Sequence, residues 1–72
     1  MNINQRNLKT AMATNCLSIR ELQTLGEVSR MTIVKALNDP TYEPIPKTIG
    51  KLANALGVSV QHLTAPTEVA YD

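Results

Sequence analysis

The 72-residue chain has one cysteine, one histidine and two aromatic residues, and each shortage excludes a class of structure. Cys16 alone cannot form an internal disulfide, and with His62 it cannot supply the ligand set of a structural zinc site. Tyr42 and Tyr71 cannot fill a core, so Leu, Ile, Val, Met and Ala must build it, and these residues suit helices. We expect Cys16 to be a small buried apolar residue in a reducing compartment, and His62 to be exposed on the last helix.

Long hydrophobic runs and a strong net charge are also missing. No stretch approaches the roughly 18 consecutive apolar residues of a membrane span, and the N-terminal residues lack the apolar core of a secretory signal, so we expect a cytoplasmic protein. The net charge is only +1. Residues 1–51 nevertheless contain all seven Lys and Arg against four acidic residues, a net of +3, whereas residues 52–72 carry −2. The positive part of the chain therefore suits an anionic partner.

The length allows one domain with a single small core. We expect a domain over residues 1–65 and a flexible tail over residues 66–72. The sequence has no set of nucleophile, base and orienting residue, no Gly-rich phosphate loop and no paired carboxylates on one predicted face. We therefore expect no enzyme, no metal, no cofactor and no small-molecule ligand.

Apolar spacing and capping residues predict two helices in the first third of the chain. The first covers about residues 4–15. The second starts at Ser18, because S-I-R-E is a capping box in which the side chains of Ser18 and Glu21 each accept a hydrogen bond from the other's backbone amide. We expect this helix to end at about Leu25, where Gly26 would take the left-handed conformation that ends helices.

Three further helices are predicted after that turn. Ser29 caps a helix of about nine residues. Three of the four prolines lie in residues 39–46 and exclude a continuous helix there, while Pro46 suits the start of a fourth helix that Gly57 ends. Ser59 caps a last short helix. The expected core residues are Leu8, Ala11, Met12, Ile33, Ala36, Leu37, Ile49, Leu52, Ala53, Leu56 and Leu63.

A short helix, a glycine-containing turn and a second helix with a polar outer face form a helix-turn-helix. The segments LSIREL and VSRMTIVKALN, followed by IGKLANALGVSVQHLT, resemble the lambda-repressor-like, Cro-type family of DNA-binding domains from about Leu8 to Thr64. The resemblance implies an all-α, compact five-helix domain whose second and third helices form the helix-turn-helix. The chain departs from the family pattern at two places, since the family has its turn glycine where Glu27 stands and a small residue where Gln23 stands.

A third departure concerns the core. Many family members join their first and third helices by a buried Arg–Glu pair at positions that align with Met12 and Leu37. Both residues are apolar here, and well-packed apolar side chains often replace a buried ion pair without loss of stability. We therefore expect Met12 and Leu37 to be in contact.

The resemblance makes the third predicted helix the recognition helix, whose N-terminal residues lie nearest the base edges of the major groove. Arg30 can donate two hydrogen bonds to guanine, whereas Met31 and Val34 can only contact a thymine methyl group. Lys35 can reach a base or a phosphate. Arg30 could instead be a solvated surface charge, and the two apolar residues could cover a helix or a protein partner. The expected base contacts are Arg30, Met31, Thr32 and Lys35.

Phosphate contacts are expected at the start of the second helix, where free amides and the helix dipole attract an anion. The family often has a phosphate-binding Gln where Ile19 stands, and Arg20 could substitute for it. The loop from Asn38 to Lys47 could supply a second clamp, in which Tyr42 is either a phosphate donor or a lid over the core. The expected phosphate contacts are Ser18, Arg20, Ser29, Asn38, Thr41, Tyr42 and Lys47.

These features predict a sequence-specific regulator of transcription that binds double-stranded DNA. We expect a small Cro-like repressor that occupies an operator as a homodimer, with a phage or another mobile element suggested by the resemblance alone. The alternative is a protein-binding helix-turn-helix module such as an antitoxin, an antirepressor or a recombination accessory factor. The candidate dimer surface consists of Val58, Val60 and Leu63 with the tail segment 69–71.

Overall fold

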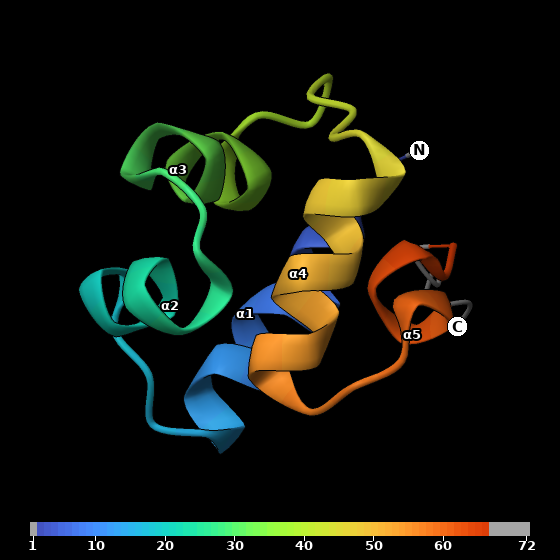
Figure 1. Ribbon diagram of the computed structural model, residues 1–72. Helices are drawn as coiled ribbons and strands as arrows, with labels where there is room; N and C mark the ends of the chain where they lie inside the picture. The colour runs from blue at the N-terminus through green and yellow to red at the C-terminus, as the bar shows by residue number, and fades with distance from the viewer. Residues whose placement is uncertain (1, 67–72) are drawn as a thin grey trace.

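The computed structural model describes residues 2–66, which form five helices and no strand (Figure 1). No helix in this range is long and apolar enough to cross a membrane. The predicted all-α, five-helix fold is therefore confirmed. The predicted tail lies outside the described residues, except for Pro66. The helices are α1 (Gln5–Thr14), α2 (Ile19–Gly26), α3 (Arg30–Asn38), α4 (Pro46–Leu56) and α5 (Val60–Thr64).

The helices begin at the capping residues that the sequence indicates. At the start of α2, the Ser18 hydroxyl accepts a hydrogen bond from the Glu21 amide at 3.1 Å, and the Glu21 carboxylate accepts one from the Ser18 amide at 3.0 Å. The Ser29 and Ser59 hydroxyls cap α3 and α5 by accepting the amides of Thr32 and His62, and Pro46 is the first residue of α4. Each cap satisfies an amide that has no partner inside its helix.

Helix α4 runs through the middle of the molecule, with α2 and α3 on one side and α5 on the other (Figure 1). Helix α1 packs against α3 and α5, and α2 packs against α3 and α4. Met12 and Leu37 are both buried in the core, on the packed pair α1 and α3. The buried apolar residues are Leu8, Ala11, Met12, Leu22, Ile33, Ala36, Leu37, Ile49, Leu52, Ala53, Leu56 and Leu63.

Asparagines of α1 and its flanks fasten the C-terminal ends of α4 and α5. Asn4 is buried. Its backbone N–H donates to the Leu63 carbonyl at 2.6 Å, and its side-chain amide donates to the Ala65 carbonyl at 2.9 Å. Asn7 donates to a carbonyl of α5, and Asn15 donates to the last carbonyl of α4 at 3.0 Å. Carbonyls at a helix end have no partner within the helix, so these side chains satisfy groups that would otherwise need water.

The prediction for Gly26 is wrong. Gly26 is the last residue of α2 and is buried, and the left-handed residue is Glu27, with φ 54° and ψ 42°. A Cβ atom on Gly26 would lie 3.6 Å from a methyl of Val28 and 3.7 Å from the Cβ of Ala55. The turn therefore begins one residue later than glycine placement suggests, at the position where the family has its glycine.

Two predictions of burial or exposure also need correction. Cys16 is exposed, because it follows α1 in a left-handed conformation with φ 54° that turns its side chain out of the core. Leu63 is fully buried, because α5 uses it as its inward residue, and it cannot be part of a dimer surface. The segment 69–71 of the predicted dimer surface lies outside the described residues.

Candidate nucleic-acid interface

Helices α2 and α3 pack against each other and are joined by residues 27–29, of which Val28 packs on the core. The inward side of α3 buries Ile33, Ala36 and Leu37. The opposite side is therefore turned away from the core. Its exposed residues are Arg30, Met31, Lys35 and Asn38, while Thr32 and Val34 are half-buried.

The first turn of α3 presents a cation and a large apolar side chain. Arg30 is exposed, and its side chain has no hydrogen bond or ion pair with any residue in the range 2–66. Met31 is 64% exposed, the highest value among the large apolar residues of that range. Neither side chain contributes to the core, so both are available to an external partner.

The hydroxyls at the start of α3 are already joined to each other. The Ser29 oxygen accepts the Thr32 amide at 3.2 Å, and the two hydroxyl oxygens lie 2.9 Å apart in a hydrogen bond. One of the two hydroxyl hydrogens is used in this pair. The pair can therefore offer one hydroxyl hydrogen to a base or a phosphate.

The start of α2 combines an anion-attracting helix end with a carboxylate. Arg20 is exposed, and its guanidinium group has no hydrogen bond or ion pair among the described residues. The hydrogen bond from the Ser18 amide, followed by the Ser18 side chain, lowers the pKa of the Glu21 carboxyl below its ordinary value. Glu21 is therefore ionised at neutral pH, and its charge reduces the attraction of this helix end for a phosphate. Arg20 has to supply the positive charge here.

The loop after α3 is organised around Asp39. The Asp39 carboxylate accepts hydrogen bonds from the Thr41 amide at 2.9 Å and from the Thr41 hydroxyl at 2.6 Å. These bonds, the hydroxyl's first, lower the pKa of Asp39. Because Asp39 occupies both donors of Thr41, the predicted phosphate contact of Thr41 has no donor in this structure. A carboxylate followed two residues later by a hydroxyl residue is typical of such a turn, and this signal was present in the sequence.

Tyr42 is half-buried, and its side chain packs against the core. This geometry agrees with the lid, one of its two predicted roles. The Lys35 ammonium lies 5.9 Å from the centre of the Tyr42 ring, within the range of a cation–π contact. Sequence reasoning missed this contact, because it depends on the path of the loop.

The remaining predicted phosphate residues lie at the two ends of this loop. Asn38 is exposed and donates one side-chain hydrogen bond to the Val34 carbonyl at 3.0 Å. Its second amide hydrogen is not used by this bond. Lys47 is exposed in the first turn of α4.

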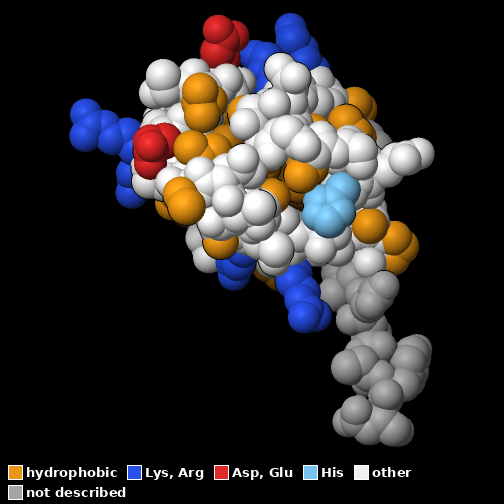
Figure 2. Space-filling model, turned by 90° about the horizontal axis from the view of Figure 1, so that it is seen from below, with side chains coloured by type: hydrophobic (Ala, Val, Ile, Leu, Met, Phe, Trp, Pro, Cys, Tyr) orange, Lys and Arg blue, Asp and Glu red, His pale blue; other side chains and the backbone are white. Residues whose placement is uncertain are grey.

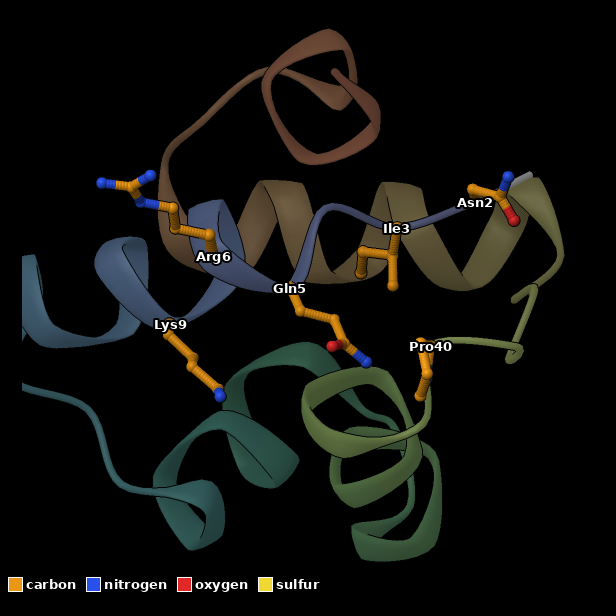
Figure 3. A pocket seen from close by; sticks show the side chains of 6 residues that line it. All are labelled: Asn2, Ile3, Gln5, Arg6, Lys9 and Pro40. Carbon is orange, nitrogen blue, oxygen red and sulfur yellow. The ribbon is translucent and has the colours of Figure 1, made fainter. Parts of the chain in front are cut away.

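A shallow depression of about 460 Å³ lies between the first turns of α1 and the loop after α3. Figure 3 shows Gln5 and Lys9 directed toward α3 and α2, whereas Arg6 points away. The Gln5 side-chain nitrogen is buried and has no hydrogen-bond partner among residues 2–66. The polar side chains of this depression do not converge on one point. The residues that line it are Asn2, Ile3, Gln5, Arg6, Lys9 and Pro40.

Figure 2 shows the face that carries the α1–α2 and α4–α5 turns. Apolar side chains show there as separate small patches, and Lys and Arg side chains project from the rim of the face. Scattered apolar residues of this kind are ordinary on a protein surface.

A short helix, a three-residue turn and a second helix with an exposed cationic first turn define a DNA-binding helix-turn-helix domain. The sequence profile of the helix-turn-helix family matches residues 8–63, and the chain belongs to this family, of the lambda-repressor-like type. The predicted resemblance is therefore confirmed, and the protein is a DNA-binding helix-turn-helix regulator. The family is generally not enzymatic. A comparison with curated proteins found no matching relative.

Proposed function

We propose that the protein is a sequence-specific repressor of the small Cro-like kind, which occupies an operator as a dimer. The observation that carries the proposal is the first turn of α3, where the Met31 side chain is exposed and the exposed Arg30 side chain has no hydrogen bond or ion pair within residues 2–66. This turn is the part of a recognition helix that lies nearest the base edges. A bound domain of this kind blocks a promoter without needing a second domain.

Arg30 reads a guanine through two hydrogen bonds to O6 and N7, and Met31 contacts a thymine methyl group. Thr32 adds a hydroxyl contact through its pair with Ser29. Arg20 and Lys47 contact phosphates on either side of the groove, together with the side chains of Ser18 and Asn38. With a net of +3 over residues 1–51, we expect the affinity to fall with salt, less steeply than for a very basic repressor.

A dimer is proposed because one domain of this size reads only one half-site. Val60 is 38% exposed on α5, and Val58 beside it is half-buried, which makes this end of the molecule the candidate dimer surface. Two half-sites would then lie about one helical turn apart on the same face of the duplex.

The test is selection from a library of random duplexes of about 30 base pairs, long enough for two half-sites, at physiological salt. Enrichment of a two-fold symmetric sequence supports both the reading of bases and the dimer. A single asymmetric half-site would overturn the dimer alone. A library recovered unchanged would overturn the proposal and favour a protein partner, for which the exposed Leu25 and Met31 would be the contact residues.

The selected duplex then tests Arg30 directly. Arg30→Ala should cost about 1–3 kcal/mol of binding free energy and relax the preference at one base pair. Arg6→Ala is the matched control, because it removes the same charge from α1, where the side chain points away from the neighbouring helices (Figure 3). Equal losses for the two variants would show that Arg30 contributes only its charge.

A further inference from the structure

Lys35 and Tyr42 form a contact that links the outer side of α3 to the loop that follows it. The Lys35 ammonium lies 5.9 Å from the centre of the Tyr42 ring. Lys35 is exposed, whereas Tyr42 is half-buried and packs on the core. The ring is therefore the fixed partner, and the lysine is the mobile one.

Hydrogen bonds hold the backbone between these two residues. The Asp39 amide donates to the Lys35 carbonyl at 2.8 Å, and the Tyr42 amide donates to the Asp39 carbonyl at 3.1 Å. The Asp39 carboxylate also accepts both donors of Thr41. The loop therefore returns Tyr42 to the side of α3 on which Lys35 stands.

The direction of the lysine matters for DNA binding. A lysine has a flexible four-carbon stem and a compact charge, so a free lysine at this position can reach base acceptors and phosphates alike. The ring lies on the loop that leaves the C-terminal end of α3, away from the first turn that carries Arg30 and Met31. An ammonium held there is withdrawn from the turn that faces the base edges.

We infer that Tyr42 is a positioning residue, whose ring directs Lys35 to a backbone phosphate at the edge of the groove and away from the bases. The inference rests on the proposed function. Lys35 then adds to the affinity for DNA but does not contribute to the preference for particular bases. The inference also assigns the role of Tyr42 to the face of its ring and not to its hydroxyl.

The test compares Tyr42→Leu with Tyr42→Phe on the duplex that the wild-type protein selects. Tyr42→Phe keeps the ring and should keep the affinity, the salt dependence and the selected sequence. Tyr42→Leu keeps an apolar side chain against the core but removes the ring. We expect a loss of affinity of about 3-fold to 10-fold and a salt slope smaller by about 1, the value of one lost phosphate contact.

A double-mutant cycle that combines Lys35→Ala with Tyr42→Leu measures the energetic coupling between the two side chains. Lys35→Ala should weaken binding to all sequences alike, and Tyr42→Leu should then have no further effect in the Lys35→Ala background. A change of base preference in Lys35→Ala would overturn the inference in favour of a base contact. A loss of affinity in Tyr42→Phe would overturn it in favour of the hydroxyl. An unchanged salt slope in Tyr42→Leu would also overturn it.

A measurement on the free protein keeps the test independent of DNA. Protons of the Lys35 side chain that lie over an aromatic ring resonate at shifted NMR frequencies, and we expect this shift in the wild-type protein and in Tyr42→Phe. Its absence in the wild-type protein would overturn the inference even if Tyr42→Leu did not fold. A shift that is present in a protein that selects no DNA sequence would contradict the proposed function and not the contact.

Discussion

Moving the glycine at the end of α2 by one position should stabilise the domain. Glu27 has φ 54° and ψ 42°, a conformation that costs a residue with a Cβ atom about 1–2 kcal/mol, whereas glycine adopts it without that cost. Glycine loses about 0.5–1 kcal/mol more chain entropy on folding. Glu27→Gly should therefore raise the free energy of unfolding by about 0.5–1 kcal/mol, the difference between these two effects.

Gly26→Ala should add to this gain. Alanine is favoured over glycine in a helix by about 0.5–1 kcal/mol. The new Cβ would meet Val28 and Ala55 at 3.6 and 3.7 Å, which are ordinary van der Waals distances. The double variant should thus gain about 1–2 kcal/mol, which raises Tm by roughly 5–15 °C in a domain of this size.

Thermal and urea unfolding followed by circular dichroism at 222 nm, a wavelength that reports helix content, would measure these gains. Glu27→Ala is the control, because it removes the carboxylate from the negative end of the α2 dipole but keeps a Cβ in the left-handed conformation. If Glu27→Gly were no more stable than Glu27→Ala, the backbone explanation would be wrong and only the charge would matter. A Gly26→Ala variant less stable than the wild type would show that the helix end cannot hold a methyl group.

Three further predictions concern α1, the α2 cap and the core. Asn4→Ala removes an N-cap and the side-chain hydrogen bond to the carbonyl of Ala65, the residue after α5, so it should cost about 2–3 kcal/mol in urea unfolding, and a loss below about 0.5 kcal/mol would contradict the proposed fastening. The lowered pKa of Glu21 means that its cap contributes stability above about pH 4.5 and loses it as the pH falls further, so Glu21→Gln should show a smaller drop in urea midpoint between pH 7 and pH 3 than the wild type, and equal drops would refute the linkage. Met12→Ala and Leu37→Ala should each cost about 2–5 kcal/mol, and a double-mutant cycle should give a coupling of at least about 0.5 kcal/mol, whereas strict additivity would mean that the two side chains do not touch.

The elements of the fold could be predicted because their signals are local. The caps at Ser18, Ser29 and Ser59 and the proline at the start of α4 each act within a few residues of their own position. The end of α2 was missed because the packing of Gly26 against α4 is a long-range fact. A glycine that ends a helix in the left-handed conformation and a glycine that is the last buried residue inside the helix look alike in a sequence.

The candidate interface likewise has a part that local sequence signals predict and a part that they do not. The exposed first turn of α3 could be predicted from the helical periodicity, because the apolar residues Ile33, Ala36 and Leu37 define the side of the helix that faces the core. The occupied donors of Thr41 and the contact between Lys35 and Tyr42 depend on how an irregular loop folds back. Neither the helical nor the strand periodicity of apolar residues predicts the path of such a loop. Asp39 two residues before Thr41 was the one local hint.

The fastening of α5 by Asn4 has a consequence for how the ends of the domain behave. The first turn of α1 and the last turn of α5 share hydrogen bonds, so neither can fray without releasing the other, and their amides should exchange with solvent as one unit.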